Sequence, residues 1–319
     1  MSPTSLVTGS LGFIGSRLTT QLLDEGHEVI GVDCVTDAYD RSEKFARLDA
    51  LREHPRYRHS GVDLAEESLD HLMGEVEVVY HLAGRAGVRE SFTSAAKYRH
   101  DNVDATQNVL SSARRSPSVR RLVYASSSSV YGNADLPFAE DGPTSPLSPY
   151  GQSKLDAERL CLESDGDELA TIALRYFTVY GPGQRPDMGL RIFAEAALER
   201  RPIRLFGDGS QSRDFTYVDD IVAATRLAAT TQARGVAVNV GGGTRITLWE
   251  VLELLAALTG ERLQVEHKGF APGDAMHTGA SLERATSLLG FRAKVDFATG
   301  YGAQVRWLRS RLSDDARAS

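Results

Sequence analysis

Tyr150 and Lys154, two side chains that exchange protons, lie four residues apart in the segment SPYGQSKLDAERL (148–160). Residues at this spacing on a helix share one face, so a helix here places the Lys154 ammonium beside the Tyr150 phenol. A free tyrosine has a pKa of about 10 and is a poor base at neutral pH, but a neighbouring positive charge favours the phenolate. The pair is therefore a candidate base with its activator, although Tyr–Lys pairs are also common on solvated helix faces.

Four consecutive serines, residues 126–129, follow the apolar run VRRLVYA (119–125). The run predicts a strand, and residues at the end of a strand in an open α/β sheet lie where such sheets bind ligands. Four hydroxyls contribute little to a hydrophobic core. We therefore expect one of these serines to contact a ligand, and a loose polar loop is the alternative.

A glycine-rich turn, VTGSLGFIGSRL (7–18), follows the first predicted strand and opens a helix, with Gly9, Gly12 and Gly15 in G-x-x-G-x-x-G spacing. Such a turn lets the backbone approach a pyrophosphate at the helix N-terminus, and Phe13 and Ile14 belong to the same predicted cofactor site. Asp33 ends the second predicted strand 18 residues after Gly15, where a carboxylate binds adenosine ribose hydroxyls. Because it would repel a 2′-phosphate, the pattern favours NAD over NADP; a strand-end turn or cap is the other interpretation of Asp33.

Short β-rich runs alternate with helical stretches through the first half of the chain. Six such runs predict an α/β fold built on a Rossmann-type doubly wound parallel sheet. The third run ends at Asp63, so Asp63 and Leu64 are expected to meet the adenine. Leu82, Ala83 and Gly84 end the fourth run, at the predicted ligand-binding edge of the sheet.

The pattern changes after Tyr176, where a Gly/Pro-rich loop leads to further helices and short strands. These segments predict a smaller, interleaved α/β lobe that binds substrate. We expect residues 1–177, with 212–245 returning to them, to form an NAD-binding domain and residues 178–319 to form the substrate lobe. A long helix is expected from about residue 94 to residue 114.

The composition is typical of a globular protein, with 41% hydrophobic and 25% charged residues. The net charge of −7 argues against nucleic acid or an anionic membrane as the main partner. Two cysteines, Cys34 and Cys161, give no metal-binding spacing and fit a reducing compartment. No segment has the features of a leader peptide or a membrane span, so we expect a cytoplasmic protein without a metal centre.

The glycine-rich turn, the strand-end serines and the Tyr-x-x-x-Lys pair, in this order, resemble the extended short-chain dehydrogenase/reductase family, the nucleotide-sugar epimerases and dehydratases. The resemblance extends from Gly9 to the Pro-Gly-Asp at 272–274. The family's serine or threonine is separated from Val-Tyr-Gly by two residues, which identifies Ser127. The resemblance implies that Ser127 hydrogen-bonds the sugar 4-hydroxyl, Tyr150 removes its proton, and Lys154 holds the nicotinamide ribose and lowers the pKa of Tyr150. It also implies cofactor contacts from Asn102, Ser126 and Tyr176.

The two residues after Ser127 indicate the type of reaction. Dehydratases and decarboxylases of the family carry acidic side chains there for further proton transfers, whereas this chain has Ser128 and Ser129. Serine hydroxyls do not perform those transfers at neutral pH, so the resemblance favours epimerisation at carbon 4.

The loop RYFTVYGPGQRPDM (175–188) resembles the substrate loop of epimerases that act on UDP-hexuronic acids. Thr178 is expected to contact the sugar, and Arg185 offers a planar fork for a carboxylate. Arg191 is the second carboxylate candidate, and solvated arginines are the alternative. The other substrate contacts implied by the resemblance are Ser128, Gly87, Val88 and Arg89 at the sugar and phosphates, Met188, Gly189 and Arg213 at the diphosphate, Leu205 and Phe206 at the uracil, and Asp274 at the ribose.

Together these patterns favour an NAD-dependent UDP-sugar 4-epimerase that converts UDP-glucuronate to UDP-galacturonate. A UDP-glucose/UDP-galactose 4-epimerase is the first alternative and a UDP-glucuronate decarboxylase the second. A non-catalytic NAD-binding regulator on the same fold represents a different class. By analogy with the family, long helices near residues 94–114 and 149–164 would pair two subunits in a homodimer.

Overall fold

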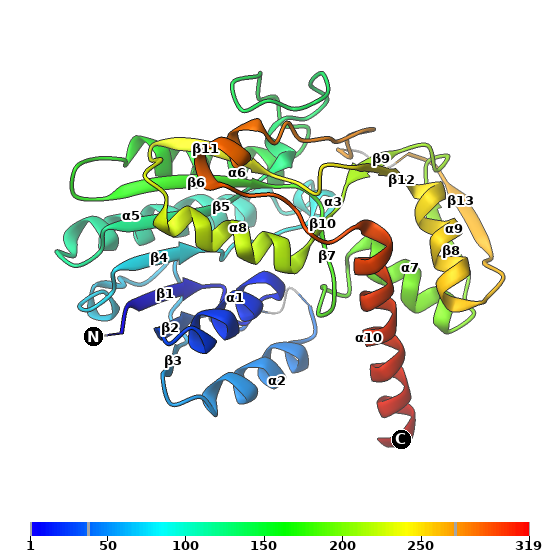
Figure 1. Ribbon diagram of the computed structural model, residues 1–319, viewed down its shortest axis with the longest axis horizontal. Coiled ribbons are helices and arrows are strands. Elements are labelled where there is room, and N and C mark those ends of the chain that lie inside the picture. Colours follow the sequence, from blue (N-terminus) through cyan, green and yellow to red (C-terminus); the bar gives the residue numbers. More distant parts are fainter. Residues whose placement is uncertain (1, 37–38, 271–272, 319) are drawn as a thin grey trace.

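Seven parallel strands form the central sheet of the computed structural model, which describes residues 2–36, 39–270 and 273–318 (Figure 1). In spatial order they are β11 (Val236–Val240), β6 (Ala170–Tyr176), β5 (Arg121–Ser127), β4 (Val78–His81), β1 (Thr4–Thr8), β2 (Glu28–Val32) and β3 (Tyr57–Ser60). Every pairing in the sheet is parallel, and the strand order reverses between β1 and β4. This confirms the expected Rossmann-type doubly wound α/β fold.

Helices cover both faces of the central sheet (Figure 1). One face packs against α1 (Phe13–Asp24), α2 (Arg41–Arg52) and α8 (Val218–Thr230), and the other against α5 (Ala105–Arg115) and α6 (Pro149–Glu163). Because both faces are covered, the strands are apolar along most of their length, and β1 and β5 are buried at every residue.

The seventh strand, β11, lies in the segment 212–245 and pairs with β6 at the edge of the sheet. Two expectations about these elements need correction. β3 ends at Ser60 rather than Asp63, which lies in the following turn with its Oδ1 accepting from the Ala65 amide (3.0 Å). The expected long helix consists of α4 (Ala95–Arg99), a π-helical turn (His100–Asp104) and α5; such turns are frequent at functional sites.

A smaller lobe follows β6 in the sequence. Its core packs α7 (Gly189–Leu198), α9 (Leu248–Thr259) and α10 (Phe297–Ala318) around β8 (Ile203–Phe206), which pairs with β13 (Val265–Lys268). Two further strand pairs are β7 (Val179–Tyr180) with β10 (Thr216–Tyr217) and β9 (Ser212–Asp214) with β12 (Arg245–Thr247). Within residues 212–245, therefore, β11 joins the central sheet and α8 packs against it, whereas β9 and β10 pair with strands outside that sheet.

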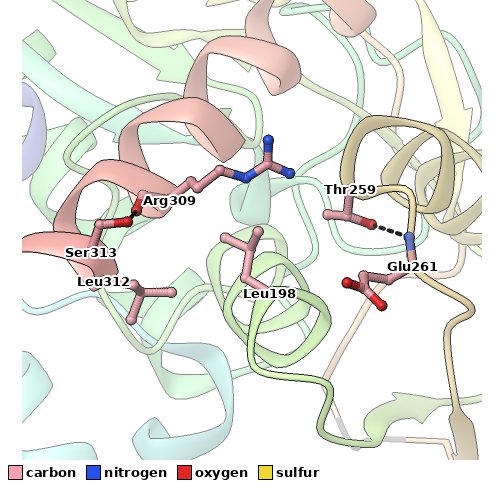
Figure 2. A pocket seen from close by; sticks show the side chains of 6 residues that line it. All are labelled: Leu198, Thr259, Glu261, Arg309, Leu312 and Ser313. Atoms are coloured by element: carbon pink, nitrogen blue, oxygen red, sulfur yellow. Dashed lines mark hydrogen bonds between the residues drawn. The ribbon is translucent and has the colours of Figure 1, made fainter. Parts of the chain in front are cut away.

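A surface cavity of about 520 Å³ lies in the smaller lobe (Figure 2). It is lined by Leu198, Thr259, Glu261, Arg309, Leu312 and Ser313. None of the residues predicted to bind cofactor or substrate lines it, so the candidate site lies elsewhere. In the part of the chain that the structure describes, no helix combines the length and apolar character that crossing a membrane requires.

Candidate active site

The carboxyl ends of four neighbouring strands bring the predicted chemistry to one edge of the sheet. Thr8 at the end of β1 pairs with His81 at the end of β4, and Ser127 at the end of β5 pairs with Tyr176 at the end of β6. The segments that follow these strands therefore lie at the same edge. They carry Gly9, Leu82, Ala83, Gly84, Ser128 and Thr178.

Ser127 lies between a short turn and the candidate base. Its Oγ accepts a hydrogen bond from the Ser129 amide (3.1 Å), which caps the 3-10 turn Ser128–Val130. The same hydroxyl is hydrogen-bonded to the phenol of Tyr150. The strand end thus holds Ser127 where it can contact both Tyr150 and a substrate hydroxyl, while Ser128 remains half-buried beside it.

α6 carries Tyr150 and Lys154 and begins close to that turn. The Ser148 hydroxyl is its N-cap and accepts from the Gly151 amide (3.1 Å). A Cβ at Gly151 would lie 2.7 Å from the Ser129 carbonyl oxygen. The glycine is therefore what lets the start of α6 approach closely enough for Tyr150 to meet Ser127.

Burial dominates the acid–base properties of the Tyr–Lys pair. It raises the pKa of Tyr150, and the hydrogen bond with Ser127 and the positive charge of Arg185 offset only part of this rise. Burial lowers the pKa of Lys154 to about 8, and the Lys154 Nζ lies 4.4 Å from the centre of the Tyr124 ring. The expectation that Lys154 lowers the pKa of Tyr150 is not supported, because Arg185 is the cation that acts on this phenol and Lys154 lies against Tyr124.

Tyr98 is a neighbour of Tyr150 that the sequence patterns did not single out. Its ring packs edge-on against the Tyr150 ring with the centroids 6.2 Å apart, and its hydroxyl donates to the Ala86 carbonyl oxygen (3.2 Å). It thereby links the candidate base to the segment that leads to Gly87. A buried tyrosine on a helix usually serves the core, so its spacing alone gave no signal.

The glycine-rich turn has the close backbone approaches that a dinucleotide site needs. Gly9 has a φ of +69°, in the left-handed region that favours glycine, and a Cβ there would lie 2.9 Å from the Ala83 amide nitrogen. A Cβ at Gly15 would lie 2.0 Å from the Gly9 carbonyl oxygen. α1 starts at Phe13 with Gly12 as its N-cap and no side-chain cap, so the first helical amides are available to a pyrophosphate.

Asp33 fits the predicted ribose contact. Its Oδ2 accepts from the Leu11 amide (3.2 Å), and its Oδ1 accepts from the Val35 amide (3.0 Å) and the Lys44 ammonium (2.8 Å). A carboxylate has about four acceptor sites, so capacity remains for a ribose hydroxyl. Lys44, on the buried side of α2, is a further polar group at this site that no motif in the sequence indicated.

Asn102 is an expected cofactor contact that has other partners. Its Oδ1 accepts from the Arg85 amide (2.6 Å), and its Nδ2 donates to the Ser153 hydroxyl (2.8 Å) and the Arg85 carbonyl oxygen (3.1 Å). A Cβ at Gly84 would lie 2.8 Å from Asn102 Oδ1 and 3.8 Å from Lys154 Nζ. Asn102 therefore fixes the turn after β4 against α6, and a polar contact from its side chain to NAD is not supported.

Ser126 and Tyr176 are also turned away from the expected cofactor contacts. The Ser126 hydroxyl donates to Glu158 Oε2 (2.5 Å). The Tyr176 hydroxyl pairs with the Thr225 hydroxyl (2.7 Å) on α8. Both side chains are buried and have polar partners inside the protein, so their predicted polar contacts to NAD are not supported.

Leu64 is one of the residues predicted at the adenine. It is buried, and its carbonyl oxygen accepts from Asn108 Nδ2 (3.1 Å).

Arg185 lies in the loop between β7 and α7 and carries its charge toward the candidate base. Its Nε and Nη2 donate to the two oxygens of Asp187 (3.0 and 2.6 Å), and its guanidinium lies 5.5 Å from the Tyr39 ring centre. Burial raises the pKa of both Tyr98 and Tyr150, and the positive charge of Arg185 opposes part of this rise. The pair with Asp187 uses one edge of the guanidinium, and within the described ranges Nη1 has no hydrogen-bond acceptor. Thr178, just before β7, is half-buried.

Arg191, the second predicted carboxylate ligand, has a different environment. It is buried on α7, where its Nη2 donates to Glu43 (2.8 Å), its Nε to Glu195 (2.7 Å) and its Nη1 to the Gln184 carbonyl oxygen (2.7 Å). All three nitrogens serve to fix α7 to α2 and to the preceding loop. The predicted contact of Arg191 with the substrate is therefore not supported.

Four of the residues predicted at the nucleotide end come together between the two lobes. Arg89, in α3 (Val88–Ser91), lies over the Phe206 ring at 4.0 Å and donates to Asp274 (3.1 Å). Arg213 is largely buried and its Nη1 donates to two backbone carbonyl oxygens (3.0 and 3.1 Å). Burial lowers the pKa of Arg213, and Asp274 opposes this effect. The cluster combines an aromatic face with positive charge, which suits a nucleotide diphosphate.

The alternation of β8 separates the two residues predicted beside the uracil. Leu205 is fully buried in the core of the smaller lobe, whereas Phe206 is 37% exposed. Phe206 fits a base contact and the Leu205 side chain does not.

Two helix starts carry other predicted substrate residues. Met188 is the N-cap of α7 and Gly189 its first residue, so the backbone amides there suit a phosphate. Gly87 is the N-cap of α3 with a φ of +122°.

The fold and this edge define a dinucleotide-binding α/β protein with a Ser-Tyr-Lys constellation, and comparison with known proteins narrows the class. Residues 5–241 match the model of the NAD dependent epimerase/dehydratase family. The chain belongs to this family, and the expected family and its NAD cofactor are confirmed. A UDP-glucuronate 4-epimerase from Thermodesulfobacterium geofontis (strain OPF15) is 36% identical in an alignment of 315 residues that covers 96% of this chain and 96% of that one.

Two solved proteins share the fold over almost their whole length. The UDP-glucuronic acid 4-epimerase from Bacillus cereus, in complex with UDP-glucuronic acid and NAD, has a TM-score of 0.92 and 32% identity, covering 97% of this chain and 99% of that one. MoeE5, with UDP-glucose and NAD, has a TM-score of 0.88 and 41% identity, covering 97% of this chain and 99% of that one. It has also been solved with UDP-glucuronic acid and NAD. The chain is thus an NAD-dependent enzyme of the nucleotide-sugar epimerase and dehydratase family.

Proposed function

We propose that this enzyme is a UDP-glucuronate 4-epimerase, which interconverts UDP-glucuronate and UDP-galacturonate. The observation that carries the proposal is Arg185, a cation whose Nη1 has no acceptor among the described residues and whose charge reaches Tyr150. In a hexuronic acid the carboxylate is attached to carbon 5, next to the reacting carbon 4. A base for the 4-hydroxyl and an arginine for the carboxylate must therefore act at one site, and the charge of Arg185 does act on the Tyr150 phenol.

The triad residues divide the proton chemistry at carbon 4. The Ser127 hydroxyl holds the 4-hydroxyl, and Tyr150 takes its proton and later returns one to the 4-ketone oxygen. In this proposal the Lys154 ammonium holds the nicotinamide ribose. NAD, when bound, accepts the hydride of carbon 4 and returns it. Inversion requires the 4-keto sugar to turn its other face before the return.

The carboxylate must also be kept from leaving. A 4-keto hexuronic acid is a β-keto acid, and it loses carbon dioxide readily when its carboxylate is perpendicular to the ketone. A contact with Arg185 through Nη1, supported by the hydroxyls of Ser128 and Thr178, would hold the carboxylate charged and out of that orientation. This reasoning, and the serines at 128 and 129, favour epimerisation over decarboxylation.

A second candidate function is epimerisation of UDP-glucose, which the complex of MoeE5 with UDP-glucose and NAD favours. The test is incubation of the protein with UDP-glucuronate and, separately, with UDP-glucose, followed by proton NMR of the products. We expect UDP-galacturonate to form at least about tenfold faster than UDP-galactose, with little UDP-4-ketopentose. Faster conversion of UDP-glucose would contradict the assignment.

Three further expectations belong to the same proposal. Residues 1–177, with α8 and β11 from 212–245, bind NAD, and residues 178–319 bind the sugar nucleotide. The protein is a homodimer paired through the helices near 94–114 and 149–164, which light scattering of the purified protein tests. It works in the cytoplasm, where its two free thiols, Cys34 and Cys161, would stay reduced.

A further inference from the structure

Glu158 is a buried carboxylate on the same helix face as the Tyr–Lys pair. It follows Lys154 by four residues and Tyr150 by eight on α6, and it is 1% exposed. Its carboxylate accepts from the Ser126 hydroxyl (2.5 Å) and from Arg175 Nε and Nη2 (3.1 and 2.6 Å). A charge this deeply buried persists only when it is paired and hydrogen-bonded. The hydrogen-bond network around Glu158 therefore calls for a functional explanation.

The partners of Glu158 belong to the strands that support the triad. Ser126 immediately precedes Ser127 on β5 and lies directly opposite Arg175 on β6. Arg175 also donates through Nη1 to the Tyr131 hydroxyl (2.7 Å), which donates in turn to Asn239 Oδ1 (2.7 Å) on β11. One network therefore ties α6 to the carboxyl ends of three adjacent strands.

We propose that Glu158 is a positioning residue for the triad: it fixes the end of β5, with Ser127, to α6, with Tyr150 and Lys154, and supplies a negative charge to the Lys154 ammonium. The inference rests on the proposed roles of Ser127, Tyr150 and Lys154, and it holds for any UDP-sugar. The contacts of Glu158 are to Ser126 and Arg175 rather than to the reacting groups, so it acts through its neighbours.

The surroundings of Lys154 give that charge its effect. Burial lowers the pKa of Lys154 to about 8, and the Cys161 thiol and the Glu158 carboxylate oppose this. Burial raises the pKa of Cys161 far above neutral, so of these two groups the negative charge is that of Glu158, the carboxylate ion-paired with Arg175 (2.6 Å). The other titratable groups around the ammonium are held neutral near pH 7 by burial: Tyr124 on β5, His81 on β4 and Tyr150 on α6.

The first experiment measures Lys154 itself and does not depend on the substrate. The chain has five lysines, Lys44, Lys97, Lys154, Lys268 and Lys294, so the Nζ and Cε signals of labelled lysine can be assigned with K154M. We expect Lys154 to titrate near pH 8 in the unmodified protein and about one pH unit lower in E158Q, because loss of an opposite charge disfavours the ammonium. An unmoved titration in folded E158Q overturns the proposal.

The second experiment separates positioning from folding by comparing three variants. Glu158→Gln should lower kcat about 100-fold or more and move the basic limb of the pH profile down by about one unit. Ser126→Ala removes the hydrogen bond from Ser126 to Glu158 without changing any charge. It should therefore lower kcat about tenfold and leave the basic limb of the pH profile unmoved. E158M/R175M replaces the buried pair by apolar side chains and should regain the Tm that E158Q loses.

In this design the double variant decides between the two roles of Glu158. If E158M/R175M recovers Tm while its kcat and its basic limb stay displaced, the carboxylate positions the triad. If it recovers all three, Glu158 serves stability alone and the proposal is wrong. Failure of the unmodified protein to convert any UDP-sugar would refute the proposed function instead. The Lys154 titration would then still test whether Glu158 supplies a negative charge to Lys154.

Discussion

Two arginine–carboxylate pairs near the triad have the same bidentate geometry and opposite surroundings. The Arg175–Glu158 side chains are 6% and 2% exposed, whereas those of Arg185–Asp187 are 15% and 41% exposed. In the first pair Nη1 of the arginine also has a protein acceptor, the Tyr131 hydroxyl. In the second, Asp187 occupies one edge of the guanidinium, and Nη1 has no acceptor in the part of the chain that the structure describes.

The two pairs share one geometry, so geometry does not separate a positioning pair from a binding pair. They differ in whether every nitrogen of the guanidinium already has an acceptor. A buried fork with every nitrogen engaged has nothing left for a ligand, and removing either partner strands the other charge. A fork at the site edge with one free nitrogen can accept a second carboxylate without first losing its own. Four variants test how far this distinction holds.

Tyr150→Phe should have the largest effect and sets the scale for the others. Both arginine pairs stay intact, but no base remains for the 4-hydroxyl, so kcat should fall by about 10³-fold or more. NAD content, measured by its release from denatured protein, should be unchanged. Activity within tenfold of the unmodified enzyme would show that another group takes the proton.

Arg175→Met should destabilise the fold. Glu158 would remain buried without its partner, at a cost of about 3–5 kcal/mol in the free energy of unfolding, measured by urea denaturation. The matched control, Arg185→Met, opens a pair at the site edge, and its loss should stay near 1 kcal/mol or less. Equal losses in the two variants would remove the distinction between the pairs.

Arg185→Ala should change substrate preference rather than stability. We expect kcat/KM for UDP-glucuronate to fall about 100-fold, because the substrate carboxylate loses its charged partner. The value for UDP-glucose should change by less than about threefold. Arg191→Ala is not an equivalent control, because Arg191 joins α7 to α2 and its loss would also affect stability. An equal loss on both sugars would sink the carboxylate assignment.

The sequence could predict the features that are set by a few consecutive residues, but not the contacts between residues that are distant in the chain. The strand–turn–helix pattern around Gly9 and the Tyr150–Lys154 spacing are local, because each is set by a few consecutive residues, and the structure has these elements where expected. A family resemblance placed Ser127, and the strand end brings it to Tyr150. The sequence also led to Arg185, a loop residue whose charge reaches the base.

The wrong or unsupported predictions concern side chains whose partners are distant in the chain. Arg191 meets Glu43 across 148 residues, and Ser126 meets Glu158 across 32. Motif spacing carries no information on such pairs, since an arginine at a helix start looks the same whether it is paired or free. For Leu205 a local signal existed: the period of two in β8 places it opposite Phe206.

Asp187→Asn should give the smallest effect and tests the binding pair from its other side. Asparagine keeps the shape and one acceptor for Arg185, so the loop should hold its conformation while the charge that repels a substrate carboxylate is lost. Because the Asp187 side chain is 41% exposed, the gain should be modest, with KM for UDP-glucuronate falling about two- to fivefold. KM for UDP-glucose should not change, and the gain should shrink at about 0.5 M salt, where charges are screened. A rise in KM for both sugars would instead mean that Asp187 orients the loop, which would make this pair, like Arg175–Glu158, a positioning pair.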